Sequence, residues 1–192
     1  MIKELAKKNR SYRRFYEDRK ITWEQLVDMI DCARYTACGG NKQTLRFLPV
    51  CDEKDNEKLF SSLHWAGYLP EWDGPAKGER PSAYIILLSE AASANATNWD
   101  EGIAAQTILL SAVEMGYGGC ILANIDRSNI VSDFAIGDDY TVKLVIALGV
   151  PKEEVVIEDI SCGDDIRYYR DSNQVHHVPK LRTQELIYGE EK

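Results

Sequence analysis

The chain has 192 residues, which is long enough for one substantial domain and short for two. Hydrophobic residues make up 44% of the sequence and charged residues 28%, so the composition is globular and excludes wholesale disorder. Twenty-three Lys and Arg against 31 Asp and Glu give a net charge of −8, which argues against the broad basic face of a nucleic-acid-binding protein. A small, local cationic pocket is still compatible with this charge.

The cysteines form an odd set of five without a C-x-x-C pair: Cys32, Cys38, Cys51, Cys120 and Cys162. This usage, together with a polar start that lacks an apolar signal segment, predicts a reducing, cytoplasmic setting with free thiols. The most apolar run, residues 102–117, is interrupted by Gln106 and Glu114 and is too short to span a bilayer. We therefore expect a soluble protein with neither a membrane nor a nucleic acid as its partner.

The first third of the chain predicts two helices around one strand. Residues 22–35 form an amphipathic helix with Thr22 as its N-cap. Its apolar face follows helical spacing and comprises Trp23, Leu26, Val27, Ile30 and Ala33. Turn-like residues 39–41 then precede a strand at 45–51 and a helix at 55–63.

A long loop is predicted next. Residues 66–81 hold three Pro and three Gly and fit neither a helical nor a strand period. Loops of this length inside a compact domain are often lids or binding loops. Trp65, Tyr68 and Trp72 either line a binding site there or fill the core beneath it. The continuous apolar run at 83–89 predicts a buried strand.

Residues 100–115 predict the most distinctive helix, because apolar side chains leave it almost no polar face. In a chain this small, such a helix either lies in the core or is pressed against a partner subunit. Gly116 follows it as an αL cap.

The remaining pattern adds a strand at 120–123, a helix at 126–134 with Asp126 as its N-cap, and a strand at 141–148. The tail at 164–192 is polar. Helices and strands mix without strict βαβ alternation, so the fold class is expected to be α+β, in one domain that spans residues 1–192.

The sequence lacks the motifs of several common enzyme chemistries. The sequence has no G-x-S-x-G elbow and no H-E-x-x-H metal motif. The adjacent His176 and His177 would point to opposite faces of a strand, so we expect solvated tail histidines and no metal site. The glycines at 116, 118 and 119 do not form a dinucleotide fingerprint, because Ile121 takes the place of the last glycine and the run ends a helix.

Two basic clusters remain. Arg10, Ser11 and Arg13 bring two guanidinium groups and a hydroxyl within four residues, a set suited to capturing a phosphate. Lys180 and Arg182 alternate along residues 178–182, so both project to one side if that segment is extended. Taken alone, each cluster is more typical of a solvated charged surface.

The two basic clusters occur with further motifs in one order along the chain, and this combination favours phosphate binding over a solvated surface. The chain resembles the FMN-dependent nitroreductase family, which opens with R-S-x-R-x-F; here Arg10, Ser11, Arg13 and Phe15 match it. The late L-G-x-P is intact at residues 148–151, and the closing P-K-x-R is intact at residues 179–182.

The second motif of the family, P-S-x-x-N-x-Q-P-W, is only partly kept. Asn41 and Gln43 stand at their places. The departures are Ala37 for Pro, Cys38 for Ser, Thr44 for Pro and Leu45 for Trp. Cys38 is either a redox-active thiol or a small residue with consequences for packing alone.

The resemblance implies an α+β fold with a central mixed sheet flanked by helices, in an interlocked homodimer that holds FMN at the subunit interface. It implies that Arg10, Ser11, Lys180 and Arg182 hold the phosphate and ribityl chain, and that Arg13 lies nearer the N1–O2 edge of the ring. The partner subunit is expected to contribute a loop next to the ring: Ala37, Cys38, Gly39, Asn41 and Gln43. Ala123 and Asn124 are expected to pass the N5 edge with their backbone.

The implied function is an FMN-dependent oxidoreductase. It passes a hydride from NAD(P)H through the flavin to a small electron-poor acceptor such as a nitro compound or a quinone, and the 66–81 loop is a candidate lid over the acceptor site. FMN carries this chemistry, so no catalytic side chain is required. The alternative is an FMN-binding module, a flavin reservoir or sensor, without steady turnover.

Overall fold

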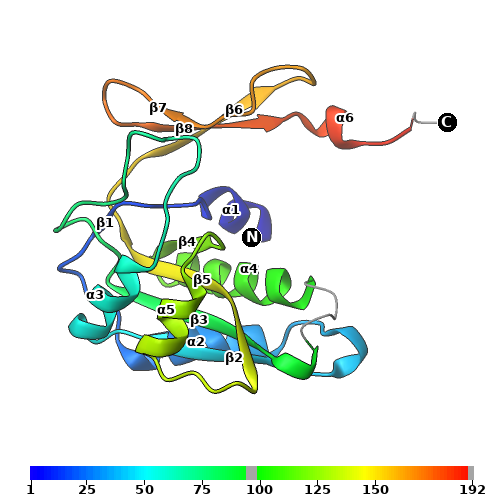
Figure 1. Cartoon of the computed structure of the whole chain (residues 1–192). Helices are drawn as coiled ribbons and strands as arrows, with labels where there is room; N and C mark the ends of the chain where they lie inside the picture. Colours follow the sequence, from blue (N-terminus) through cyan, green and yellow to red (C-terminus); the bar gives the residue numbers. More distant parts are fainter. Residues whose placement is uncertain (94–98, 190–192) are drawn as a thin grey trace. The chain divides into compact units, whose positions relative to one another are not determined.

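The computed structural model describes residues 1–93 and 99–189 (Figure 1). Its contacts divide the chain into two compact units, which we call the large unit (Met1–Trp65 and Asp73–Lys152) and the small unit (Ala66–Trp72 and Glu153–Lys192). The single domain expected from the length of the chain stays a prediction, because two compact units can belong to one cooperatively folding domain. None of the described helices is long and apolar enough to cross a membrane.

The large unit alternates helices and strands in the α+β manner that the sequence predicts. Its helices are α1 (Ile2–Lys8), α2 (Trp23–Arg34), η1 (Gly39–Asn41), α3 (Glu53–Ser61), η2 (Ala91–Ser93), α4 (Trp99–Glu114) and α5 (Arg127–Asp133). Its strands are β1 (Phe15–Tyr16), β2 (Leu45–Val50), β3 (Ala83–Glu90), β4 (Gly118–Leu122) and β5 (Tyr140–Pro151).

These strands form one five-stranded sheet in the order β1-β5-β3-β2, with β4 also paired to β5. The pairs β1–β5, β2–β3, β3–β5 and β4–β5 are all antiparallel. The sheet is therefore antiparallel and not mixed as expected; an isolated parallel bridge joins Ser11, which lies outside its strands, to Gly119 of β4.

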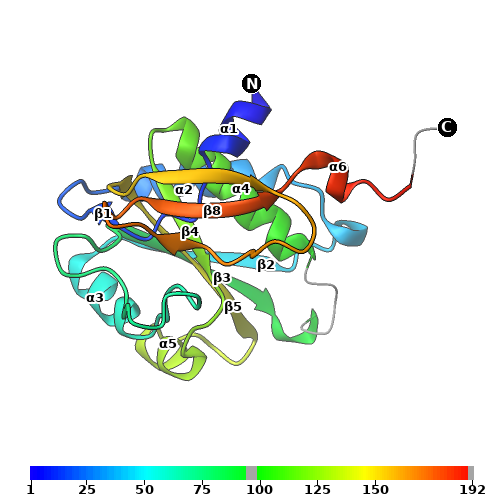
Figure 2. The same cartoon turned by 90° about the horizontal axis from the view of Figure 1, so that it is seen from above.

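Helices cover both faces of the sheet. Ile85 and Leu87 of β3 belong to the core cluster that includes side chains of α2 and α4, whereas the alternate residues Tyr84 and Ile86 are buried on the opposite face. Figure 2 shows α3 and α5 on that opposite side of the strands. Burial on both faces explains the continuous apolar run that predicted this strand.

Side-chain caps fix where several helices begin. Thr22 forms a capping box with Gln25 at the start of α2, and Asp126 accepts a hydrogen bond from the Asn129 amide at the start of α5, so both predicted caps are confirmed. Helix α3 begins two residues earlier than predicted. The reason is Asp52, which accepts hydrogen bonds from the amides of residues 54 and 55.

Strand β5 is longer than predicted. It continues past Leu148 to Pro151, because β1 pairs with its end in the register Phe15–Pro151 and Tyr16–Val150. A long-range partner therefore overrides the strand-ending tendency of Gly149 and Pro151.

Helix α4 is less buried within this chain than its sequence predicts. Its core face is buried and comprises Ala104, Ala105, Ile108, Leu109 and Ala112. On other sides Trp99 is 74% exposed and Ile103 is 41% exposed. The neighbouring α2 likewise leaves Trp23 51% exposed and Val27 43% exposed, so its true core residues are Leu26, Met29 and Ala33.

The small unit contains a three-stranded sheet in the order β6-β8-β7, made of β6 (Val155–Ile160), β7 (Tyr169–Arg170) and β8 (His176–Leu181), with α6 (Thr183–Leu186) after it. The β6–β8 pair is parallel and the β7–β8 pair is antiparallel.

The tail histidines are not solvated, which corrects the sequence-based expectation. His176 is 1% exposed and its ring lies 5.2 Å from that of Tyr168. His177 stacks on Tyr169 at 4.8 Å. They point to opposite faces of β8, as their adjacent positions predict.

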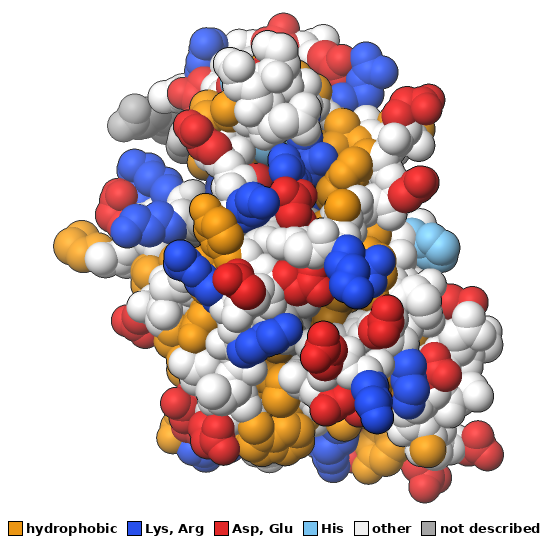
Figure 3. Space-filling model, turned by 90° about the vertical axis from the view of Figure 1, so that its left-hand side faces the viewer, with side chains coloured by type: hydrophobic (Ala, Val, Ile, Leu, Met, Phe, Trp, Pro, Cys, Tyr) orange, Lys and Arg blue, Asp and Glu red, His pale blue; other side chains and the backbone are white. Residues whose placement is uncertain are grey.

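The surface carries both signs of charge. On the face drawn in Figure 3, Lys and Arg side chains are interspersed with Asp and Glu side chains. This pattern is unlike the single-signed basic face that phosphate-backbone recognition requires.

Candidate functional site

The segment that carries Arg10, Ser11 and Arg13 is fixed to the sheet of the large unit. The Tyr12 amide donates a hydrogen bond of 3.0 Å to the Gly119 carbonyl, and Phe15 pairs with Pro151 in β5. Three segments therefore meet in one place: the arginine motif at residues 10–15, the glycines at 118 and 119, and L-G-x-P at residues 148–151.

Two glycines make this close approach possible. A Cβ atom on Gly118 would lie 2.6 Å from the Tyr12 ring, and one on Gly149 would lie 2.8 Å from the Phe15 ring. Real Cβ atoms do not approach other atoms so closely, so a larger residue at either position would push the arginine segment away from the sheet.

The arginines of this segment have different environments. Arg13 is buried and its Nη1 donates to the Ser11 carbonyl at 3.1 Å, whereas Arg10 is half-buried. Arg14 forms a bidentate pair with Glu79, with hydrogen bonds of 2.6 and 2.8 Å. Arg14 is therefore committed to the fold, and the matching motif residues Arg10 and Arg13 are the candidates for a ligand.

The Arg14–Glu79 pair is extended by Lys152, whose Nζ lies 2.9 Å from Glu79 Oε1. The hydrogen bond from Arg14 is the largest cause that lowers the pKa of Glu79, and Lys152 adds to it against the opposing effect of burial. The resulting pKa is about 2. This network ties the end of β5 to the arginine segment.

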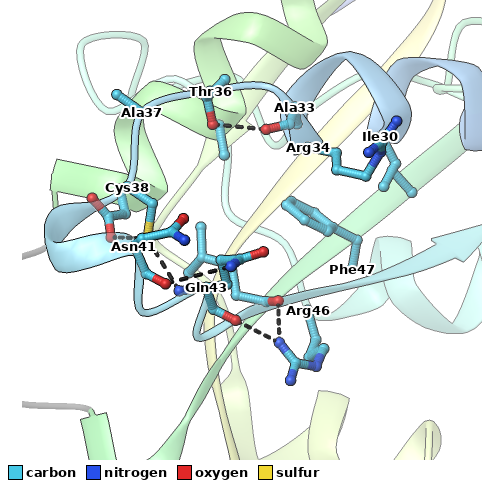
Figure 4. A pocket seen from close by; sticks show the side chains of 13 residues that line it. Ile30, Ala33, Arg34, Thr36, Ala37, Cys38, Asn41, Gln43, Arg46 and Phe47 are labelled. Atoms are coloured by element: carbon cyan, nitrogen blue, oxygen red, sulfur yellow. Dashed lines mark hydrogen bonds between the residues drawn. The ribbon is translucent and has the colours of Figure 1, made fainter.

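A second group of predicted residues lines a cavity of about 420 Å³ in the large unit (Figure 4). Ala37, Cys38, Asn41 and Gln43 all contribute to its wall. The other lining residues are Ile30, Ala33, Arg34, Thr36, Leu45, Arg46, Phe47, Asp100 and Ala104. The wall therefore combines apolar side chains with polar and charged ones, among them the exposed side-chain amides of Asn41 and Gln43.

Asp100 was missed by the sequence analysis. Its carboxylate accepts hydrogen bonds from Cys38 Sγ at 3.1 Å and from the Gly39 amide at 3.1 and 3.2 Å. In the sequence, Asp100 looks like an ordinary acidic residue in the first turn of a helix, which the helix dipole favours. No local pattern indicates a partner 62 residues away.

Ala123 and Asn124 follow β4 and have exposed side chains. The Ala123 carbonyl accepts from Arg127 Nη2 at 3.2 Å, and the Asn124 carbonyl accepts from the His64 amide at 3.1 Å. Both carbonyls therefore serve the fold, and the expected backbone contact of this turn with a cofactor stays a prediction.

Lys180 and Arg182 belong to the small unit, at the end of β8, so the extended conformation that the sequence analysis left as a condition is present. The Lys180 side chain is exposed, and Arg182 Nη1 donates to Ser161 Oγ at 3.0 Å. Their convergence with Arg10 on one phosphate stays a prediction.

The model of the Nitroreductase family matches residues 6–150. No curated protein matches the sequence.

Solved structures share the fold. One is a nitroreductase family protein from Clostridium novyi NT, with 22% identity, a TM-score of 0.64, and coverage of 79% of this chain and 87% of that chain. Another is an FMN-dependent nitroreductase from Clostridium difficile R20291, with 24% identity, a TM-score of 0.63, and coverage of 80% and 89%. A third, from Streptococcus pneumoniae TIGR4, has 18% identity, a TM-score of 0.65, and coverage of 80% and 92%. Because the family model matches well over half of the sequence, this chain belongs to the nitroreductase family.

Proposed function

We propose that the protein is an FMN-dependent oxidoreductase that passes a hydride from NAD(P)H to a small electron-poor acceptor, such as a nitro compound or a quinone. The observation that carries the proposal is the arginine segment at residues 10–13, held on the sheet with Arg13 buried. The family membership supports it, and so does the fold shared with a protein described as an FMN-dependent nitroreductase.

The residues present fit FMN by their donor chemistry. Arg10, Ser11 and Arg13 offer two guanidinium groups and a hydroxyl on one segment, and a phosphate dianion with neighbouring polyol hydroxyls needs such donors. Asn41 and Gln43 add side-chain amides to a cavity wall that combines apolar and polar side chains, which suits a planar ring with a polar rim.

Bound FMN supplies the hydride chemistry, so the side chains bind and orient. Arg13 is 9% exposed, and a cation held in such a poorly solvated position stabilises negative charge on a nearby ring edge more strongly than a solvated one does. Its hydrogen bond to the Ser11 carbonyl limits the orientations that the guanidinium can adopt. Arg10 and Ser11 then hold the phosphate and ribityl chain.

We further propose a homodimer with FMN at the subunit interface. The exposed apolar side chains of α2 and α4, above all Trp23, Trp99 and Ile103, support a protein partner for these helices. In this arrangement residues 37–43 of one subunit face the cofactor held by the other, and Lys180 and Arg182 join Arg10 at the phosphate. The free state of all five cysteines supports a reducing, cytoplasmic setting.

A flavin reservoir or sensor without steady turnover is the second candidate. The observation that favours it is the altered second motif, in which Cys38 directs its thiol to Asp100 and the two prolines and the tryptophan are replaced. A loop so changed could retain the cofactor and still lack a productive acceptor site.

One experiment separates these candidates. The purified protein, or the protein mixed with FMN, is expected to show the yellow absorption of bound flavin and to bleach anaerobically with NADH or NADPH. Rapid reoxidation by a nitroaromatic compound or a quinone would support the oxidoreductase. Bound flavin that stays oxidised with both nicotinamides would favour the reservoir, and a colourless protein that does not bind added FMN would defeat both.

A further inference from the structure

Asp100 joins two segments that are distant in the sequence. It lies in the first turn of α4, a 16-residue helix, and its side chain is half-buried in the wall of the cavity. Its two carboxylate oxygens receive the Cys38 thiol and the Gly39 amide. One side chain on a regular helix therefore fixes the beginning of the loop at residues 38–43.

The sulfur of Cys38 also closes this loop. While its thiol donates to Asp100, its Sγ atom accepts a hydrogen bond of 3.2 Å from the backbone N–H of Gln43. The end of the loop is held separately by Arg46, whose Nη1 donates to the Gln43 carbonyl at 2.8 Å and whose Nη2 lies 2.9 Å from Glu90. Figure 4 shows the Gln43 and Arg46 side chains at the cavity and the hydrogen bond from Arg46 to the Gln43 carbonyl.

The loop needs such contacts because its backbone is unfavourable on its own. Gly40 has a φ of 60°, Asn41 a φ of 52° and Gln43 a φ of 52°. Left-handed backbone of this kind is disfavoured for residues with a Cβ, and it persists where surrounding structure imposes it. The two residues with amide side chains at the cavity are thus the ones with strained backbone.

We propose that Asp100 is a positioning residue for the cofactor-binding loop. In this proposal Cys38 links Asp100 to Gln43 by hydrogen bonds and is not a redox centre. The inference rests on the proposed function, in which residues 38–43 contact FMN. The Asp100–Cys38–Gln43 chain supplies the restraint that two prolines and a tryptophan give the loop in the resembled motif, where this chain has Ala37, Thr44 and Leu45.

The first test does not depend on the cofactor. Amide hydrogen exchange of residues 38–43 is measured by mass spectrometry in the parent protein, in Asp100→Ala and in the control Asp28→Ala, an exposed aspartate on α2. We expect exchange in this loop to rise about tenfold in Asp100→Ala and to stay at the parent rate in Asp28→Ala. Unchanged exchange in Asp100→Ala would overturn the proposal.

The second test reads the cofactor. FMN affinity is measured by flavin fluorescence, and Asp100→Ala is expected to bind about tenfold more weakly than the parent. Asp100→Asn keeps one acceptor oxygen and should fall between the two, and it decides the question if Asp100→Ala does not fold. Faster loop exchange with parental FMN affinity would overturn the positioning role. A parent protein that binds no FMN would instead overturn the proposed function, and the loop exchange would still decide whether Asp100 holds the loop.

The conservative variant Cys38→Ser distinguishes a hydrogen-bonding role of Cys38 from a redox role. A serine hydroxyl can both donate to Asp100 and accept from the Gln43 backbone amide, so Cys38→Ser should keep the amide exchange of residues 38–43 as slow as in the parent, whereas Cys38→Ala should raise it. Cys38→Ala should lose affinity as Asp100→Ala does, and the double variant should lose little more than either single one. Loss of turnover in Cys38→Ser with full FMN binding would show a redox role for the thiol and contradict the proposal.

Discussion

The Phe15 ring packs against Gly149, where β1 pairs with the end of β5. Phe15 is fully buried, and a Cβ atom on Gly149 would lie 2.8 Å from its ring. This contact determines how closely the arginine segment approaches the sheet, because Arg13 lies only two residues before Phe15. The glycine of L-G-x-P is thus a packing requirement for the candidate site.

Gly149→Ala tests this requirement. The added methyl must displace the Phe15 ring, so we expect the variant to be less stable by about 1–3 kcal/mol, the range for overpacking a core. Chemical denaturation measures the difference. Gly137→Ala is the matched control, since nothing lies within 4 Å of the added atom there. Equal stability of Gly149→Ala and the parent would show that β1 can shift without cost.

Arg10→Ala and Arg182→Ala test the phosphate site. Removing one charge-assisted hydrogen bond should weaken FMN binding by roughly 1.5–3 kcal/mol, about 10- to 150-fold, as read by fluorescence titration. Arg19→Ala, which removes an exposed arginine near the same segment, should leave the affinity unchanged. If both test variants bind FMN like the parent, the proposed placement of the phosphate is wrong.

Capping residues and apolar runs were enough to predict the helices and strands whose positions depend on them. Thr22 and Asp126 cap helices where expected, and the apolar run of β3 lies in the middle of the sheet. The resemblance named the arginine segment and four of the residues that line the cavity, Ala37, Cys38, Asn41 and Gln43, but not Asp100.

What the sequence did not predict depends on distant partners. The end of β5 becomes strand because Phe15 pairs with it, and Asp100 matters because Cys38 lies beside it. The same reason explains the error about the histidines. Residues 155–160 include two acidic residues and were not predicted as a strand, yet in β6 they pair with β8 and bring Glu158 to His177.

Glu79→Gln tests the network behind the arginine segment through its pH dependence. The folded protein holds the pKa of Glu79 at about 2, below its ordinary 4.5, so the carboxylate stabilises the fold above pH 4.5. This contribution is lost as the pH falls toward 2. We expect the parent to lose stability more steeply than Glu79→Gln between pH 5 and pH 3, measured by urea denaturation. Parallel profiles would contradict the prediction, and Glu71→Gln controls for removing a carboxylate elsewhere.

The His177 imidazole gives the small unit the opposite pH dependence. Its Nδ1 lies 2.7 Å from Glu158 and its Nε2 lies 3.5 Å from Asp171. Burial alone lowers the pKa of His177, but these two carboxylates outweigh burial and raise it above 6.5. The protonated ring therefore stabilises β6 and β8 below that pH, and this stabilisation is lost as the pH rises through the folded pKa. We expect an NMR titration of His177 to show a midpoint above 6.5 that falls in Glu158→Gln; an unchanged midpoint in that variant would refute the role of the carboxylate.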